Sequence, residues 1–192
     1  MKSVAVYCGS SDRIEEEYLS AARELGKAAA VKGIKVIYGG GSTGMMGAVA
    51  TSAMDAGGDV VGVIPEMFDT PQLALTSTTE YIVTPDMHTR KAMIAEMAEG
   101  FIALPGGFGT LEEFFEILTW AQIGLHSKPI GLLNVNGFFD TMLEFLDEVQ
   151  SKGFSYKRHN KLFSVVSGPI ELLELMQSYV PPEGLAKWVD RD

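Results

Sequence analysis

Two kinds of hydrophobic pattern alternate along this chain. Short apolar runs rich in β-branched residues predict strands, whereas longer segments with apolar positions three or four apart predict amphipathic helices. Strands are expected at residues 4–8, 36–38, 60–64, 81–83, 101–104, 130–133 and 163–166. Helices are expected at residues 15–32, 45–56, 88–98, 111–125, 138–152 and 169–179.

This alternation predicts βαβ units and therefore an α/β fold, a doubly wound, Rossmann-like three-layer sandwich with a mostly parallel sheet of about seven strands. At 192 residues and 46% hydrophobic content, the chain is long enough for one well-buried domain and short for two. We therefore expect residues 1–192 to form a single domain. Right-handed crossovers bring the carboxyl ends of the strands to one edge of the sheet, where ligands of such folds bind.

Residues 101–113 join an apolar strand to a glycine-rich turn and then to a helix that opens with carboxylates. The glycines of this turn let a ligand approach the main chain, and Thr110 can cap the helix. Free N–H groups of a first helical turn favour an anion, and Glu112 and Glu113 place a carboxylate beside it. The two glutamates can also serve only to complement the helix dipole, but the neighbouring glycines favour a functional interpretation.

A second glycine-rich loop follows the strand at 36–38 and opens a helix. Gly39, Gly41 and Gly44 satisfy the dinucleotide-binding pattern G-x-G-x-x-G, and Glu66, about 20 residues on, can serve as the ribose-binding acid. However, this loop follows the second strand rather than the first, and it competes with the later turn for the phosphate role. One mononucleotide held between the two glycine turns explains both motifs.

Arg90 and Lys91 form an adjacent basic pair at the start of a predicted helix. Arginine offers a planar fork for phosphate or carboxylate, and lysine offers a mobile point charge. The alternative interpretation is that both are solvated surface residues. Met87, Met93 and Met97 recur at helical spacing, which favours a role in core packing.

The formal net charge of -10 argues against nucleic acid or an acidic membrane surface as a partner, because such partners need a basic face. No run of about 18 apolar residues is present to span a bilayer. The chain also begins with a strand-like segment rather than a signal-type one, so a cytoplasmic location is expected.

The cysteine and histidine content points away from metal or thiol chemistry. The single cysteine, Cys8, ends an apolar strand, which suggests a buried thiol more than a nucleophile. His88, His126 and His159 lie too far apart in sequence to show the spacing of metal ligands, so no metal is expected.

Taken in order, these motifs resemble the Lonely-guy (LOG) family of cytokinin riboside 5'-monophosphate phosphoribohydrolases, whose bacterial members were often labelled lysine decarboxylases. The resemblance rests on residues 39–47, 87–91, 105–113, 119–124 and 128–134, and it extends to residues 187–190. It implies a Rossmann-like nucleotide-binding domain and a homodimer with the active site near the subunit interface. It further implies hydrolysis of the N-glycosidic bond of an adenine-type (cytokinin) nucleoside 5'-monophosphate or AMP, with no cofactor.

The resemblance also assigns roles to residues. Arg90 and Glu113 match the catalytic pair. Many members have a glutamate at the position of Gln72, which leaves base preference open. The residues that match or flank the substrate are Gly40, Gly41, Gly44, Gln72, Met87, Lys91, Gly106, Gly107, Phe108, Gly109, Thr110, Leu111, Glu112 and Thr119.

The implied chemistry is coherent. Breaking a ribosyl C–N bond builds positive charge on the sugar, which Glu113 can oppose while it orients water. Arg90 is too basic to donate a proton easily, so it is assigned to electrostatic stabilisation, and the proton source stays open. The 5'-phosphate would be anchored by the amides of 106–110 and by Lys91.

Three other functions are weighed against this interpretation. A lysine decarboxylase needs pyridoxal phosphate and a Schiff-base lysine, and no lysine stands in a convincing cofactor setting. A nucleotide-binding module without catalysis would bind AMP and release no base. A dinucleotide oxidoreductase would bind NAD.

Overall fold

The computed structural model describes residues 1–183, so the resemblance at 187–190 lies outside the described residues. The strands are β1 (Ser3–Tyr7), β2 (Lys35–Tyr38), β3 (Val60–Pro65), β4 (Glu80–Thr84), β5 (Phe101–Ala103), β6 (Ile130–Leu133) and β7 (Phe163–Val166). The α-helices are α1 (Glu16–Val31), α2 (Gly44–Asp55), α3 (Met87–Met97), α4 (Phe108–Gln122), α5 (Asp140–Ser151) and α6 (Pro169–Gln177).

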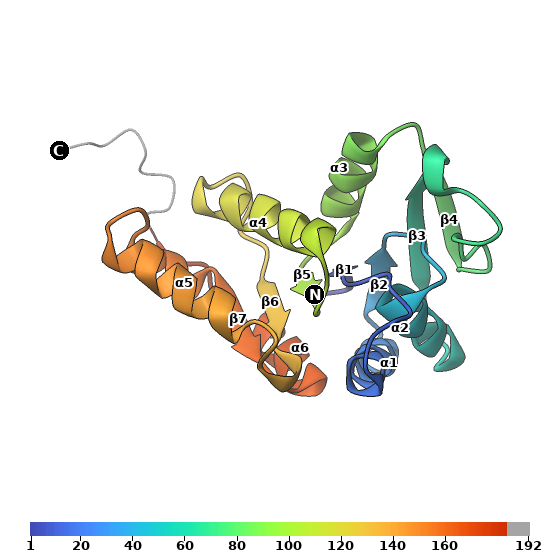
Figure 1. The fold of residues 1–192 in the computed structure, drawn as a ribbon, viewed down its shortest axis with the longest axis horizontal. Helices are drawn as coiled ribbons and strands as arrows, with labels where there is room; N and C mark the ends of the chain where they lie inside the picture. Colours follow the sequence, from blue (N-terminus) through green and yellow to red (C-terminus); the bar gives the residue numbers. More distant parts are fainter. Residues whose placement is uncertain (184–192) are drawn as a thin grey trace.

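Each predicted strand and helix is present, which confirms the doubly wound α/β fold (Figure 1). All strand pairings in the described part of the chain are parallel, and the strand order is β4-β3-β2-β1-β5-β6-β7. The winding reverses between the neighbours β1 and β5. Their carboxyl ends therefore diverge into loops that leave a crevice at this switch point, the usual ligand site of such sheets.

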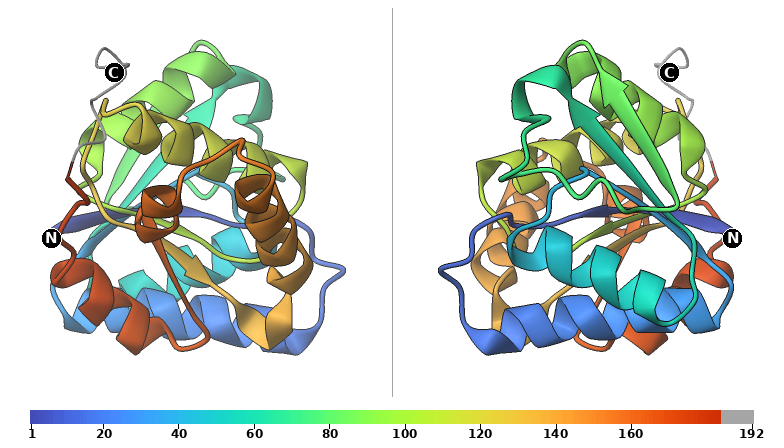
Figure 2. Two further views of the ribbon diagram at one scale, coloured as in Figure 1. Left: turned by 90° about the vertical axis from the view of Figure 1, so that its left-hand side faces the viewer. Right: turned by 90° about the vertical axis from the view of Figure 1, so that its right-hand side faces the viewer.

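Helices cover the two faces of the sheet with separate cores. On one face α1, α2 and α6 pack against alternate strand residues, and Figure 2 shows these three helices together below the sheet. On the other face α3 and α4 pack against the intervening strand residues, such as Ala5, Tyr7 and Ile37. This alternation follows from the period of two along a strand, since both faces of a parallel sheet are buried.

The segment between β3 and β4 has little regular structure. It contains a 3-10 turn at Glu66–Phe68 and an isolated antiparallel bridge between Ala74 and Gly41 of the loop after β2. The segment therefore lies against the first glycine-rich loop at the carboxyl edge of the sheet.

Candidate active site

The second glycine-rich turn, which follows β5, leads directly into α4. This helix begins at Phe108, three residues before the predicted start at residue 111, with Gly107 as its N-cap. The prediction that Thr110 caps α4 is wrong, because Thr110 lies inside the first turn. Its hydroxyl points toward Gly106 instead: a Cβ on Gly106 would lie 2.2 Å from Thr110 Oγ1.

The first turn of α4 keeps its amides free. No side chain caps the helix, and among the described residues the N–H groups of Phe108, Gly109 and Thr110 have no hydrogen-bond partner. Free amides at a helix N-terminus carry partial positive charge and attract an anion. This end of α4 is therefore a candidate anion site, and phosphate binding there stays a prediction.

Arg90 of α3 and Glu113 of α4 form a largely buried ion pair beside these amides. Arg90 Nη1 lies 3.1 Å from Glu113 Oε1, and the two side chains are 12% and 11% exposed. Arg90 is fixed further by a bond of 3.1 Å from Nε to the carbonyl of Val63 and by a contact of Nη1 with Met87 Sδ. The interpretation of Arg90 as a solvated surface residue is therefore wrong.

Burial changes the acidity of Glu113. Removal from water raises the pKa of this carboxyl above its ordinary value, and the positive charge of Arg90 opposes that rise. Glu113 is thus a poorly hydrated carboxylate whose compensating charge comes chiefly from one arginine. Such a group suits stabilisation of positive charge in a reacting ligand.

Lys91 is held by two carboxylates of α4. Its Nζ lies 2.5 Å from Glu112 and 3.0 Å from Glu116, and its side chain is 11% exposed. Although burial favours the neutral amine, the hydrogen bonds to Glu112 and Glu116 raise the pKa of Lys91 above its ordinary value. A Schiff-base lysine must be neutral to react, so this arrangement does not suit pyridoxal phosphate chemistry at Lys91.

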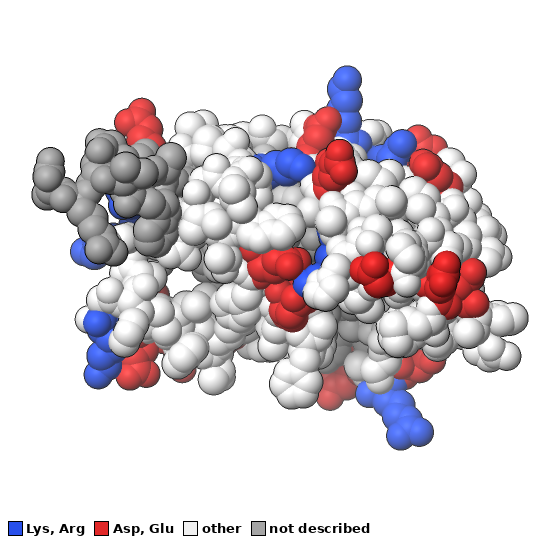
Figure 3. Space-filling model, turned by 90° about the horizontal axis from the view of Figure 1, so that it is seen from above, with Lys and Arg blue, Asp and Glu red and all other residues white. Residues whose placement is uncertain are grey.

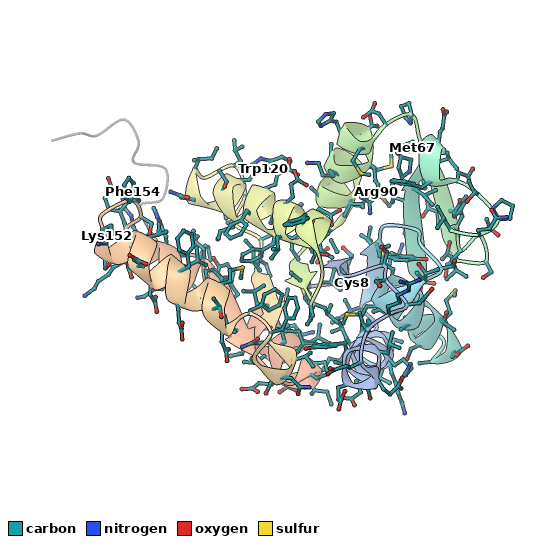
Figure 4. The ribbon with its side chains drawn as sticks, in the orientation of Figure 1. Cys8, Met67, Arg90, Trp120, Lys152 and Phe154 are labelled. Carbon is teal, nitrogen blue, oxygen red and sulfur yellow. The ribbon has the colours of Figure 1, made fainter. Side chains whose placement is uncertain are left out.

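These groups face a cleft of about 350 Å³ at the switch point. Figure 4 shows Arg90 on α3 above Cys8, which follows β1 at the floor of the cleft. Three groups of residues line the cleft. Residues 6–10 come from the end of β1 and the loop that follows it, and Gly107, Gly109, Thr110, Glu112 and Glu113 come from the turn before α4 and from the start of this helix. The other lining residues are Gly39, Met46, Phe68, Met87, Arg90 and Lys91.

An apolar annex of about 260 Å³ adjoins the cleft on the side of Arg90. The annex shares Ser10, Gly39, Met46, Phe68, Met87 and Arg90 with the cleft and adds Gly41, Thr43, Ile64, Pro65 and Leu73. Its lining is mostly apolar, so it extends the cleft with a surface of thioether, aromatic and aliphatic groups.

The first glycine-rich loop differs from the second in the use of its amides. Gly44 N donates to Asp12 Oδ1 at 2.8 Å, and Met45 N donates to the carbonyl of Gly9 at 3.0 Å. The first two amides of α2 are therefore already bonded to the loop after β1, whereas Met46 N has no partner among the described residues. Glu66, the candidate ribose-binding acid, is exposed and does not line the cleft. The geometry thus gives the dinucleotide interpretation no support.

Several predicted substrate-binding residues lie outside the cleft lining of a single chain. Gly40 packs close to Ile64, Leu111 packs against the core, and Phe108 points to solvent at 93% exposure. Gln72 is exposed on the 66–79 segment, and Thr119 lines a separate groove between α4 and α5. The remaining residues of this kind are Gly41, which borders the annex, Gly44, which is bonded to Asp12, and Gly106, which lies behind the turn.

The floor of the cleft offers no activated nucleophile. Burial, followed by the charge of Glu113, raises the pKa values of Tyr7 and Cys8 above their ordinary range, so both stay protonated. Cys8 is buried, as its sequence position predicts. Within residues 1–183, no three His, Cys, Asp or Glu side chains gather as a metal site would require.

Sequence reasoning missed four residues of this site. Met46 and Phe68 line the cleft, Glu116 pairs with Lys91, and Asp12 caps α2 from a distant loop. Glu116 could have been found, because it lies one helical turn after Glu112 on the same face of α4. The other three carry no local signal, since their positions depend on tertiary packing.

Charges of both signs are mixed on one face of the molecule. On the face seen in Figure 3, Lys and Arg side chains are scattered among Asp and Glu and form no basic patch. No helix among residues 1–183 combines the length and hydrophobicity that a membrane crossing requires.

A doubly wound sheet with a free helix N-terminus and a buried arginine–glutamate pair at its switch point defines a Rossmann-like α/β protein with a site for a small anionic ligand. The protein family described as possible lysine decarboxylase matches residues 46–176. A probable cytokinin riboside 5'-monophosphate phosphoribohydrolase of Oryza sativa subsp. japonica is 43% identical and covers 94% of this chain and 85% of its own. One of Arabidopsis thaliana is 43% identical over 94% of this chain and 90% of its own. This chain belongs to that family, the Lonely-guy (LOG) phosphoribohydrolases, which confirms the resemblance.

Solved structures confirm the fold. A molybdenum cofactor binding protein from Rippkaea orientalis has a TM-score of 0.70 at 22% identity and covers 93% of this chain and 97% of its own. The molybdenum cofactor carrier protein of Chlamydomonas reinhardtii has a TM-score of 0.68 at 24% identity and covers 92% and 98%. At this identity the likeness concerns the architecture alone.

Proposed function

We propose that this enzyme hydrolyses the N-glycosidic bond of adenine-type nucleoside 5'-monophosphates, including cytokinin nucleotides and AMP, to free base and ribose 5-phosphate. The observation that supports this most is the buried Arg90–Glu113 pair, which faces the same cleft as the free amides of α4. The names of the relatives support the same reaction. No cofactor is needed for this hydrolysis.

In the proposed reaction, the bond between the anomeric carbon and the base nitrogen breaks and its electrons leave with the base. Glu113 stabilises the positive charge that develops on the ribose and orients the attacking water. The water molecule adds its hydroxide to the anomeric carbon, and its remaining proton neutralises the negative charge on the departing base. Arg90 orients the substrate and holds Glu113 through the bond from Nη1. A guanidinium is a poor proton donor, so Arg90 is not assigned to protonation of the base.

The phosphate is proposed to bind at the first turn of α4, where the amides of Phe108, Gly109 and Thr110 are free. The binding energy of the phosphate then holds the sugar against Glu113, although the contacts that anchor the phosphate are remote from the bond that breaks. Lys91 approaches the phosphate by leaving Glu112, whose side chain is 55% exposed and can turn into solvent.

The base is proposed to lie toward the apolar annex. Met46, Met87 and Phe68 connect the cleft with this annex, and Leu73 closes its far side. An apolar substituent on the base would bury its surface there at about 25 cal/mol per Å². Gln72 is the chain neighbour of Leu73, so its difference from the family's glutamate is expected to affect base preference.

A homodimer is proposed from the apolar surface of α4, α5 and the segment that follows α5. Phe115, Phe145 and Phe154 are 36%, 61% and 82% exposed in the single chain, and patches of this kind favour association. Thr119 lies in the groove between these helices, so it could reach a substrate only across a subunit interface. Light scattering after size exclusion tests this proposal, and a monomer at micromolar concentration would contradict it.

We further propose that residues 1–192 form one nucleotide-binding domain that acts in the cytoplasm.

The proposed function is tested by incubation with AMP and with an N6-prenylated analogue, followed by chromatography. Free base and ribose 5-phosphate in equal amounts would support it. Tight AMP binding without base release would instead indicate a nucleotide-binding module, and a pyridoxal absorbance band in the purified protein would revive the decarboxylase label.

A further inference from the structure

Gly39 lies against the guanidinium of Arg90. A Cβ built on Gly39 would stand 2.0 Å from Arg90 Nη2, which is too close for any side chain, and 3.1 Å from Cζ, which is a tight contact. The guanidinium therefore occupies the space that a side chain at position 39 would need.

The backbone does not require glycine at this position. Gly40 and Gly44 have φ angles of 75° and 57°, in the left-handed region that favours glycine, whereas Gly39 is absent from the positive-φ residues of the described chain. Alanine would thus be compatible with the local main chain, so the requirement for glycine arises from its neighbours: chiefly from Arg90, and to a smaller extent from Met46 Sδ, which would stand 3.2 Å from the Cβ.

The room left by Gly39 allows Arg90 to keep one nitrogen of its guanidinium free. Nε is bonded to the Val63 carbonyl and Nη1 to Glu113, while Nη2 has no partner among the described residues. Gly39 lines both the cleft and the apolar annex, so Nη2 is presented where the two meet. A donor at this position can reach a ligand without first breaking the bonds that hold the arginine.

We propose that Gly39 is a positioning residue for Arg90. In this proposal the first glycine-rich run makes room for the guanidinium of Arg90 and does not bind the phosphate. The amides of Gly44 and Met45 agree with this role, because they are bonded to Asp12 and Gly9 and are not offered to an anion. The proposal rests on the proposed function, in which Arg90 is catalytic.

A double-mutant cycle tests the proposal. Gly39→Ala should lower turnover of AMP by on the order of 100-fold, as expected when a catalytic group is misplaced. It should leave the affinity for ribose 5-phosphate within about twofold, since α4 holds the phosphate. In an Arg90→Ala background, Gly39→Ala should have little further effect, because the two changes act through one group. Additive losses, or a selective loss of ribose 5-phosphate affinity, would overturn the proposal.

Gly58→Ala serves as a control for stability. Its Cβ would stand 2.6 Å from Ala30 Cβ, away from the cleft, so it should lower the melting temperature and leave the KM and turnover of the folded fraction unchanged. If Gly39→Ala alone fails to fold, Gly39→Ala with Arg90→Ala should fold, since the clashing partner is gone. Failure of that double variant to fold would count against the proposal.

A crystal structure of Gly39→Ala separates this inference from the proposed function. Displacement of the guanidinium from the Val63 carbonyl would support the inference even if the wild-type protein released no base. An arginine that keeps its bonds to Val63 and Glu113 would overturn the inference even if the wild-type protein were fully active.

Discussion

The two glycine-rich turns at the carboxyl edge of the sheet have similar sequences and opposite uses. In the first turn, the first two amides of α2 are bonded to Asp12 and Gly9, and Gly39 leaves room for a neighbouring side chain. In the second turn, the first three amides of α4 are free among the described residues. A glycine motif therefore does not define a phosphate site by itself, and the decisive property is whether the helix amides already have acceptors.

The second turn also lies beside the acid. Thr110 and Glu113 are three residues apart on α4, so an anion at the start of this helix would bring its attached sugar near the carboxylate. If the comparison is correct, changes at the second turn should affect catalysis and substrate affinity. Changes at the contacts that close the first turn should affect stability.

The largest effect is expected for Glu113→Gln. This change keeps the shape of the side chain but removes its charge, so turnover should fall by about two orders of magnitude or more. AMP affinity should change little, because the phosphate anchor is intact. Steady-state kinetics together with calorimetry measure both quantities. Near-normal turnover would refute the assignment of Glu113.

The second effect concerns pH. Burial raises the pKa of Glu113, and the proposed mechanism needs the ionised form, so kcat should fall as pH decreases through this raised pKa. Below the pKa, one required deprotonation gives about a tenfold loss for each pH unit. The acid limb should lie above the range of an ordinary glutamate. A profile that is flat down to pH 4 would contradict this.

A third effect is expected from Phe108→Pro. Proline removes one free amide at the first position of α4, where it is tolerated, and the extended Gly107 (φ -87°, ψ -158°) can precede it. Loss of one hydrogen bond to a charged group costs about 1.5–3 kcal/mol, so KM for AMP should rise at least tenfold. Phe108→Ala is the matched control, because it removes the same exposed ring and keeps the amide. Equal KM values for the two variants would place the phosphate elsewhere.

The smallest effect is expected from Asp12→Ala at the first turn. Loss of the acceptor for Gly44 N should destabilise the protein by about 0.5–2 kcal/mol, as for other helix caps. The melting temperature should fall by a few degrees, and Asp12→Asn should restore part of it. The affinity for ribose 5-phosphate should not change. A large loss of that affinity would make the first turn part of the phosphate site.

The sequence predicts much of this architecture. Hydrophobic periodicity locates each strand and helix, and the glycine pattern locates both turns. The start of α4 is placed too late, because glycines at 107 and 109 lower helix propensity in a segment that tertiary contacts make helical.

The contacts that distinguish the two turns could not be predicted. Gly44 bonds to a carboxylate 32 residues away, and Arg90 finds Glu113 across 23 residues, so neither contact leaves a local pattern. Thr119 was grouped with the substrate by resemblance alone, and in one chain it lies in another groove.

The charges around the cleft have a consequence for encounter kinetics. Arg90 and Lys91 are outnumbered by Glu112, Glu113 and Glu116, and the whole chain carries a formal charge of -10. A dianionic nucleotide therefore approaches against a repulsive long-range field, and short-range contacts must capture it after arrival. Added salt screens that repulsion, so the bimolecular association rate should increase with ionic strength.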